Sequence, residues 1–172
     1  MEPGNADPSA ALAGWVTETR VAVALGSNLG DREASLRGAA DALVDFIDRL
    51  TLSSFIETAP VGVVEPQPWY LNAAAVGTTS LPPRALLEQL LAVERTHGRV
   101  RTVPNAARTL DLDLILYGGA VIDEPGLVVP HPRFRGRAFV LVPLAEIAGN
   151  MVEPVTGETI GALAARLGKQ AE

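Results

Sequence analysis

The stretch that most constrains the fold of this chain is RTLDLDLILYG, which runs from Arg108 to Gly118. In a β-strand, successive side chains point to opposite faces of the sheet. The alternation predicts one apolar face made of four leucines, Leu110, Leu112, Leu114 and Leu116. The opposite face begins with Thr109, Asp111 and Asp113 and continues with Ile115 and Tyr117. The sequence therefore predicts a strand that packs its leucines in a core and carries two adjacent carboxylates on its other side.

Asp111 and Asp113 need an explanation, because two ionised carboxylates side by side on a sheet repel each other unless a positive group lies between them. Mg²⁺ prefers oxygen ligands and is often held by one or two carboxylates together with substrate phosphates. An edge strand with a solvated polar face is the alternative interpretation. A D-x-D pattern alone does not separate the two, since short motifs often match by chance.

The composition excludes several classes of protein. The 172 residues are enough for one domain with a substantial core. The net charge of −6 argues against a nucleic-acid partner held by a basic surface. The chain has no cysteine, which excludes disulfides, thiolate metal sites and a cysteine nucleophile, and its 2 histidines are too few for a zinc site.

The start of the chain reads as an extension of the folded domain. Residues 1–19 are rich in Pro, Gly and Ala and lack the basic segment and apolar core of a signal peptide. No apolar run approaches the length of about 18 residues that a membrane span needs. We therefore expect a flexible extension at 1–19, a single domain at 20–172, no membrane partner and a location in the cytoplasm.

Arginine supplies nearly all of the basic side chains, and Lys169 is the only lysine. The arginines gather on both sides of the acidic pair, as Arg95, Arg99, Arg101 and Arg108 before it and as Arg133, Arg135 and Arg137 after it. The planar guanidinium suits phosphate oxygens. Two such clusters on an acidic chain indicate a small anionic ligand.

Hydrophobic periodicity predicts an α+β domain in which helices pack on a mostly antiparallel sheet. Strands are predicted at 20–25, 51–57, 69–79 and 108–118. Helices are predicted after Asp31, from Pro82 and Pro83 to Glu94 or beyond, and over 158–168, whereas 138–148 is predicted to begin as a strand and then turn helical. The segments 59–68 and 99–107 are predicted to be binding loops.

The chain lacks the G-x-x-x-x-G-K-[ST] loop, the G-x-G-x-x-G fingerprint and the G-x-S-x-G elbow. The remaining feature is an acidic pair framed by arginines and loops. This is the set of groups that phosphoryl transfer uses, with a metal bridging phosphate oxygens and arginines neutralising charge.

The chain resembles the 6-hydroxymethyl-7,8-dihydropterin pyrophosphokinases of folate biosynthesis. The resemblance covers about residues 20–165 and rests on motifs that occur in order: ALGSNLGDR, SSFIETAPVG, YLNAA, GRVR, RTLDLDLILYG and VPHPRFRGRAFVLVPLAEI. It implies a three-layer α-β-α fold with a ferredoxin-like core. It also implies transfer of the β,γ-pyrophosphoryl group of ATP to the pterin hydroxymethyl group with release of AMP, and the use of two Mg²⁺ ions.

The resemblance assigns roles to individual residues. It implies that Asp111 and Asp113 hold the magnesium ions, and that Arg99 and Arg108 act with them in catalysis. The residues it implies for ATP binding are Glu94, Arg99, Arg101, Arg108, His131 and Arg137. Those it implies for the pterin are Thr58, Val61, Tyr70, Asn72 and Phe139, with the two aromatic rings stacking on the pterin. We expect a monomer that binds these two small molecules.

The sequence departs from the family pattern in one loop. Asn105, Ala106 and Ala107 stand where many members have Trp-Gly-Pro, which predicts weaker trapping of the pterin by a closing loop. No general base is evident: the metals could acidify the pterin hydroxyl, or an aspartate could accept its proton. Three other interpretations also stay open at this point: an inactive homologue that only binds ATP or pterin, an interaction module without a ligand, and one half of a larger folate enzyme.

Overall fold

The computed structural model describes residues 17–97 and 109–171. Its elements in chain order are β1 (Thr19–Ser27), α1 (Arg32–Leu43), β2 (Asp48–Leu52), β3 (Ile56–Thr58), β4 (Tyr70–Thr79), α2 (Pro83–Thr96), β5 (Asp111–Tyr117), β6 (Ile122–Glu124), β7 (Leu127–Val129), the 3₁₀ turn η2 (Phe134–Gly136), α3 (Ala138–Ala148) and α4 (Ile160–Gln170). Of the segments discussed above, 1–16 and 98–108 lie outside the described residues.

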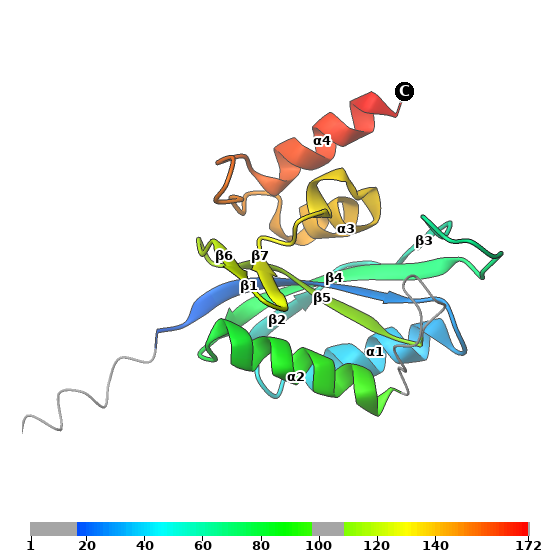
Figure 1. Ribbon diagram of the computed structural model, residues 1–172, viewed down its shortest axis with the longest axis horizontal. Coiled ribbons are helices and arrows are strands. Elements are labelled where there is room, and N and C mark those ends of the chain that lie inside the picture. Colours follow the sequence, from blue (N-terminus) through cyan, green and yellow to red (C-terminus); the bar gives the residue numbers. More distant parts are fainter. Residues whose placement is uncertain (1–16, 98–108, 172) are drawn as a thin grey trace, which may run out of the picture.

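The central sheet has the strand order β2-β4-β1-β5, and β3 also pairs with β4 (Figure 1). Every strand pair of the described residues is antiparallel. The long strands β1 and β4 form the centre, with Gly26 opposite Asn72 at one end of their ladder. β6 and β7 form a separate hairpin.

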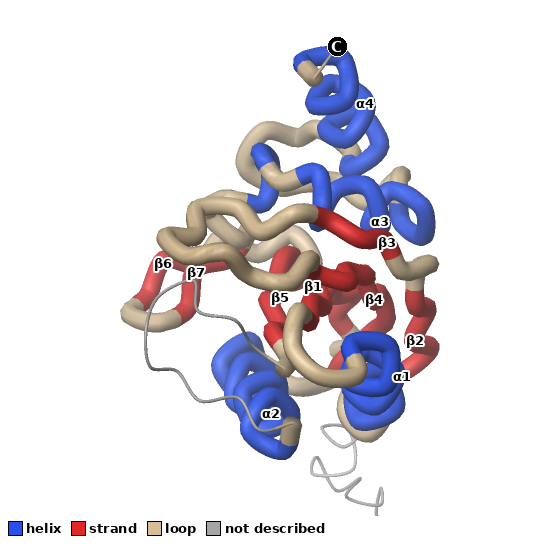
Figure 2. Tube along the Cα trace, turned by 90° about the vertical axis from the view of Figure 1, so that its right-hand side faces the viewer, coloured by secondary structure: helices blue, strands red, loops and turns tan. Residues whose placement is uncertain are grey.

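Helices cover both faces of the sheet and give three layers (Figure 2). On one face, α1 and α2 bury Leu36, Leu43, Leu86 and Leu90 against β1, β4 and β5. On the other, α3 packs on the sheet through Val140, Leu141 and Leu144, and α4 packs on α3. The expected α+β class with a three-layer arrangement is confirmed. None of the described helices has the length and apolarity that crossing a membrane requires.

The strand predicted at 51–57 is two strands. Ser53 ends the regular ladder, because its own Oγ accepts a hydrogen bond from the Ala74 amide at 2.8 Å. Glu146 of α3 then accepts hydrogen bonds from the Ser54 amide at 3.0 Å and from the Ser54 hydroxyl at 2.5 Å. These side-chain contacts divert the chain between β2 and β3.

Residues 138–148 are helical throughout, so the prediction that this segment begins as a strand is wrong. The β-branched residues and Pro143 disfavour a helix locally. The side chains of Val140, Leu141, Leu144 and Ala148 nevertheless share one helical face, which is buried against the sheet. Tertiary packing thus overrides local propensity in α3.

A bulge in β5 changes the predicted faces of that strand. Val23 pairs with Leu114 and Ala22 with Leu116, so Ile115 is an extra residue in the ladder. Ile115 and Leu116 both belong to the α3 side of the core, while Tyr117 packs on the α1 and α2 side. The predicted sharing of a face by all four leucines is therefore wrong at Leu116, and Tyr117 does not share the aspartate face.

Candidate active site

Asp111 and Asp113 lie at the start of β5, before the bulge. They pair with Gly26 and Ala24 of β1. Leu112 and Leu114 are buried on the α1 and α2 side, so the alternation directs both carboxylates to the α3 side of the sheet. Both aspartates are partly exposed. The shared face predicted for the pair is therefore observed, at an end of the sheet that solvent reaches.

The donor set around the pair limits which ion it suits. Within residues 17–97 and 109–171, no group of three or more His, Cys, Asp and Glu side chains is placed to hold a metal ion. Asp111 and Asp113 offer two hard carboxylate ligands. Mg²⁺ commonly takes one or two carboxylates and completes its shell with substrate phosphates and water. The pair therefore fits magnesium that binds together with a phosphate ligand.

Two segments outside the central sheet form hydrogen bonds with the free edge of β5. Glu94 of α2 is only 2% exposed, and its Oε1 accepts a hydrogen bond from the Leu112 amide at 2.8 Å. Further along the strand, the His131 amide donates to the Ile115 carbonyl at 3.0 Å. The Glu94 contact fixes the backbone between the two aspartates, so this residue positions the pair.

Glu94→Ala is expected to destabilise the protein, because it leaves the buried Leu112 amide without this acceptor. We expect the free energy of unfolding to fall by about 1–3 kcal/mol. Urea denaturation measures it, with the exposed Glu88→Ala on the same helix as the matched control. Equal unfolding free energies for the two variants would contradict the positioning role.

His131 lies in an electropositive corner beside the acidic pair. Burial lowers the pKa of His131, Arg137 and Arg133 lower it further, and Asp111 raises it, which leaves a pKa of about 4. The ring is therefore uncharged at neutral pH. Its Nδ1 accepts a hydrogen bond from the Arg133 amide at 3.2 Å, which assigns the ring proton to Nε2. His131 thus offers a neutral N–H donor and is a poor proton acceptor.

A second group of predicted residues lies on the same face of the sheet, on β3 and β4, with β1 between this group and the acidic pair. Asn72 is buried, and its Nδ2 donates to the Thr58 hydroxyl at 2.6 Å. Tyr70 lies two residues before Asn72 and pairs with Thr58. Between this group and Asp111 lies Gly26, where an added Cβ would stand 3.2 Å from Asn72 Oδ1 and 3.6 Å from Tyr70 Cδ1. The absence of a side chain at Gly26 therefore lets the Asn72 and Tyr70 side chains lie close against the β1 backbone.

The loop between β3 and β4 is anchored by residues that the motif analysis quoted but gave no role. Asn28, 1% exposed, donates through Nδ2 to Gln67 Oε1 at 3.0 Å and to the Pro68 carbonyl at 3.2 Å. Arg32 donates to the Trp69 carbonyl at 2.9 Å. Val61, a predicted pterin residue, lies in this loop with 73% of its surface exposed.

The other predicted residues have different surroundings. Phe139, at the start of α3, packs partly on the α3-side core, and the Arg137 guanidinium lies 5.4 Å from the centre of its ring. Arg99, Arg101 and Arg108 lie outside the described residues, as does the 105–107 segment. The structure thus brings the acidic pair, His131 and Arg137 to one face with Thr58, Tyr70 and Asn72.

Comparison with known proteins places this site within a matched region. The family model described as 7,8-dihydro-6-hydroxymethylpterin-pyrophosphokinase matches residues 22–149. A 2-amino-4-hydroxy-6-hydroxymethyldihydropteridine pyrophosphokinase of Methylorubrum extorquens is 43% identical over 151 residues, which cover 87% of this chain and 94% of that protein. A protein of the same description from Synechocystis is 44% identical over 140 residues, which cover 80% of this chain and 71% of that protein.

Solved structures support the fold. The HPPK-DHPS of Plasmodium falciparum aligns with a TM-score of 0.71 at 14% sequence identity. The alignment covers 90% of this chain and 45% of that chain, so this chain spans somewhat less than half of the solved protein. At this identity the likeness concerns the fold alone.

Proposed function

Since this chain belongs to the 7,8-dihydro-6-hydroxymethylpterin-pyrophosphokinase family, we propose that it transfers the β,γ-pyrophosphoryl group of ATP to the hydroxymethyl group of 6-hydroxymethyl-7,8-dihydropterin. The pterin hydroxyl loses its proton, and its oxygen forms a bond to the β-phosphorus. The bond between that phosphorus and the oxygen shared with the α-phosphate breaks, and AMP leaves with this oxygen. The pterin diphosphate is an intermediate of folate biosynthesis.

One observation carries the proposal: the acidic pair and the Thr58–Asn72 pair lie on one face of the sheet, on opposite sides of Gly26 of β1. The acidic pair supplies the phosphate end of the site. The amide of Asn72 offers both a donor and an acceptor, which suits the edge of a pterin ring. A reaction between a phosphate and a pterin needs both ends together.

At the phosphate end, Asp111 and Asp113 would hold two Mg²⁺ ions, which neutralise charge on the triphosphate when they are bound. His131 donates its Nε2–H to a phosphate oxygen. Arg137, whose guanidinium faces His131 and lies over Phe139, adds a positive charge there. We assign Arg99, Arg101 and Arg108 to the triphosphate as well, on the resemblance alone, with Arg99 and Arg108 in the catalytic set.

At the pterin end, Thr58 orients the Asn72 amide, because its hydroxyl accepts one of the Nδ2 hydrogens. Tyr70 and Phe139 stack on the ring, and the backbone at Val61 closes one side. Glu94 supports ATP binding indirectly, because it holds the β5 backbone between the two aspartates. We further propose that the protein is a monomer with one domain at 20–172 and works in the cytoplasm.

The test is to incubate the protein with ATP, Mg²⁺ and 6-hydroxymethyl-7,8-dihydropterin and to measure the AMP that forms by chromatography. AMP that appears only when the pterin is present supports the proposal. ADP in place of AMP would mean that a single phosphoryl group is transferred. No AMP, with an ATP analogue still bound, would mean that the chain is a binding protein.

Gly26→Ala is expected to weaken pterin binding by about tenfold, because the new Cβ would press on Asn72 Oδ1 at 3.2 Å. Calorimetric titration with the pterin, in the presence of a non-hydrolysable ATP analogue, measures the effect. Gly119→Ala is the matched control, since a Cβ there meets nothing within 4 Å. An unchanged pterin Kd in the Gly26→Ala variant would contradict the placement of the pterin beside Asn72.

A further inference from the structure

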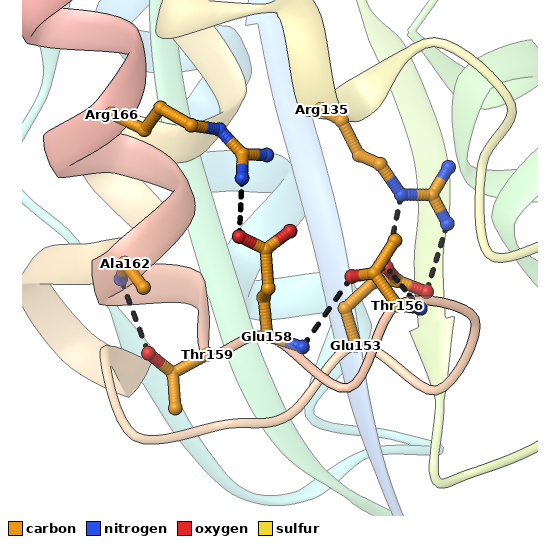
Figure 3. Close-up of polar contacts among 7 residues, drawn as sticks. All are labelled: Arg135, Glu153, Thr156, Glu158, Thr159, Ala162 and Arg166. Carbon is orange, nitrogen blue, oxygen red and sulfur yellow. Dashed lines mark hydrogen bonds and ion pairs between the residues drawn. The ribbon is translucent and has the colours of Figure 1, made fainter.

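Glu153 is a buried carboxylate that none of the roles above uses. It lies in the turn between α3 and α4, its side chain is 0% exposed, and its two oxygens face a set of donors (Figure 3). The Val155 amide donates to Oε1 at 2.5 Å. The Thr156 amide and hydroxyl donate to Oε2 at 3.1 Å and 2.7 Å. A turn that stabilises its own buried anion in this way is built around that charge.

The remaining partner of Glu153 comes from another part of the chain. Arg135 of η2 approaches it with a two-point contact, Nε to Oε2 at 3.0 Å and Nη2 to Oε1 at 2.8 Å (Figure 3). The same guanidinium lies 4.9 Å from the centre of the Phe134 ring, and Phe134 is fully buried in the α3-side core. Arg135 therefore fastens the loop before α3 to the turn after it.

Arg135 stands midway in the sequence between Arg133 and Arg137, whose positive charges both lower the pKa of His131. Hydrogen bonds link residues along this loop. The Arg133 amide donates to the side-chain Nδ1 of His131, and the Arg137 amide donates to the Phe134 carbonyl at 3.1 Å. The Arg137 carbonyl in turn accepts from the Val140 and Leu141 amides at the start of α3. A rotation of the loop at Arg135 would therefore move both flanking arginines.

We infer that Glu153 is a positioning residue for the phosphate end of the site, which acts through Arg135 to hold the 131–137 loop with Arg133 and Arg137 close to His131. The inference rests on the proposed function for the identity of the ligand, ATP. Glu153 touches neither the acidic pair nor His131 in the contacts described above, so its effect on the ligand passes through the loop.

The ionised carboxylate is needed at this position. Glutamine would place an NH₂ group among the guanidinium, two amides and a hydroxyl, so at least one donor would lose its acceptor. If Glu153 and Arg135 were exchanged, the Val155 and Thr156 amides would face a cation. The pair therefore has one workable orientation, which makes Glu153→Gln and Arg135→Lys the informative variants.

The experiment measures KM for ATP, KM for the pterin and kcat in Glu153→Gln, together with the Kd of a non-hydrolysable ATP analogue. Arg166→Gln is the matched control: it removes the ion pair with Glu158 next to the same turn but does not touch the 131–137 loop. We expect KM and Kd on the ATP side to rise about fivefold to tenfold in Glu153→Gln, with KM for the pterin unchanged. The control should stay within about twofold.

Arg135→Lys keeps a positive charge but loses the two-point contact, so its ATP-side effect should fall between wild type and Glu153→Gln. Thermal melts verify that each variant is still folded at the temperature of the assay. An unchanged ATP-side Kd in folded Glu153→Gln would overturn the inference, and so would equal rises in both KM values. The proposed function has its own test, because it is contradicted if the wild type forms no AMP. In that case the Kd of the ATP analogue in Glu153→Gln still decides the role of Glu153.

Discussion

Replacing Asp111 with asparagine should lower kcat for AMP formation by at least about a hundredfold, since it removes one of two carboxylates available to hold Mg²⁺ against the triphosphate. Asparagine has nearly the same shape and keeps one oxygen, so the packing of β5 should be preserved. Asp113→Asn should have an effect of the same order, because both side chains lie on one face of the strand.

Initial rates of AMP release at saturating ATP and pterin, with Mg²⁺ in excess, measure this effect. Asp123→Asn is the matched control, since Asp123 is an exposed acid on β6. Calorimetry with the ATP analogue should show that the Mg²⁺-dependent part of binding is lost in Asp111→Asn. Near-normal rates in both Asp111→Asn and Asp113→Asn would exclude the acidic pair as the metal site and leave the solvated polar face as its explanation.

The acidic pair was predictable because it depends only on strand alternation. Asp111 and Asp113 face the α3 side as the pattern requires, and their neighbours Leu112 and Leu114 are buried opposite. The pattern fails two residues later, at Leu116. The extra residue at Ile115 arises from pairing with β1, and nothing within RTLDLDLILYG marks it.

Other features of the site depend on contacts between segments far apart in the sequence. Gly26 is one such case: its importance follows from the register that sets it between Asn72 and Asp111, and the motif that contains it does not reveal this. Glu94 is another. A glutamate near the end of an amphipathic helix ordinarily faces solvent, but here α2 packs beside an edge strand whose Leu112 amide needs an acceptor.

α3 shows the same limit for the fold. Its β-branched residues favour a strand locally, and the helical spacing of Val140, Leu141 and Leu144 becomes decisive only when the α3 side of the sheet is available to bury it. Family resemblance predicted the overall architecture correctly, and it is the basis of the residue roles that we propose. It could not give the Arg135–Glu153 contact, because Arg135 lies in a quoted motif but Glu153 lies outside all of them.

The stability of the protein in acid should depend on Glu153. Burial raises the pKa of this carboxyl, but hydrogen bonds from Arg135, Thr156 and the amides of Val155 and Thr156 outweigh burial and lower the pKa from 4.5 to about 2. The unfolded chain therefore binds a proton on this group at a higher pH than the folded chain does. The stabilisation is fully present above pH 4.5 and is lost as the pH falls toward 2.

For this one group, the free energy of unfolding should fall by about 2 kcal/mol between pH 6 and pH 3. Other carboxylates titrate in the same range, so the informative quantity is the difference between wild type and Glu153→Gln. Urea denaturation at pH 6, 5, 4 and 3 should show that difference shrinking by about this amount as the pH falls. Parallel curves would mean that the Glu153 carboxyl has an ordinary pKa in the folded state, and the turn would then not be built around its charge.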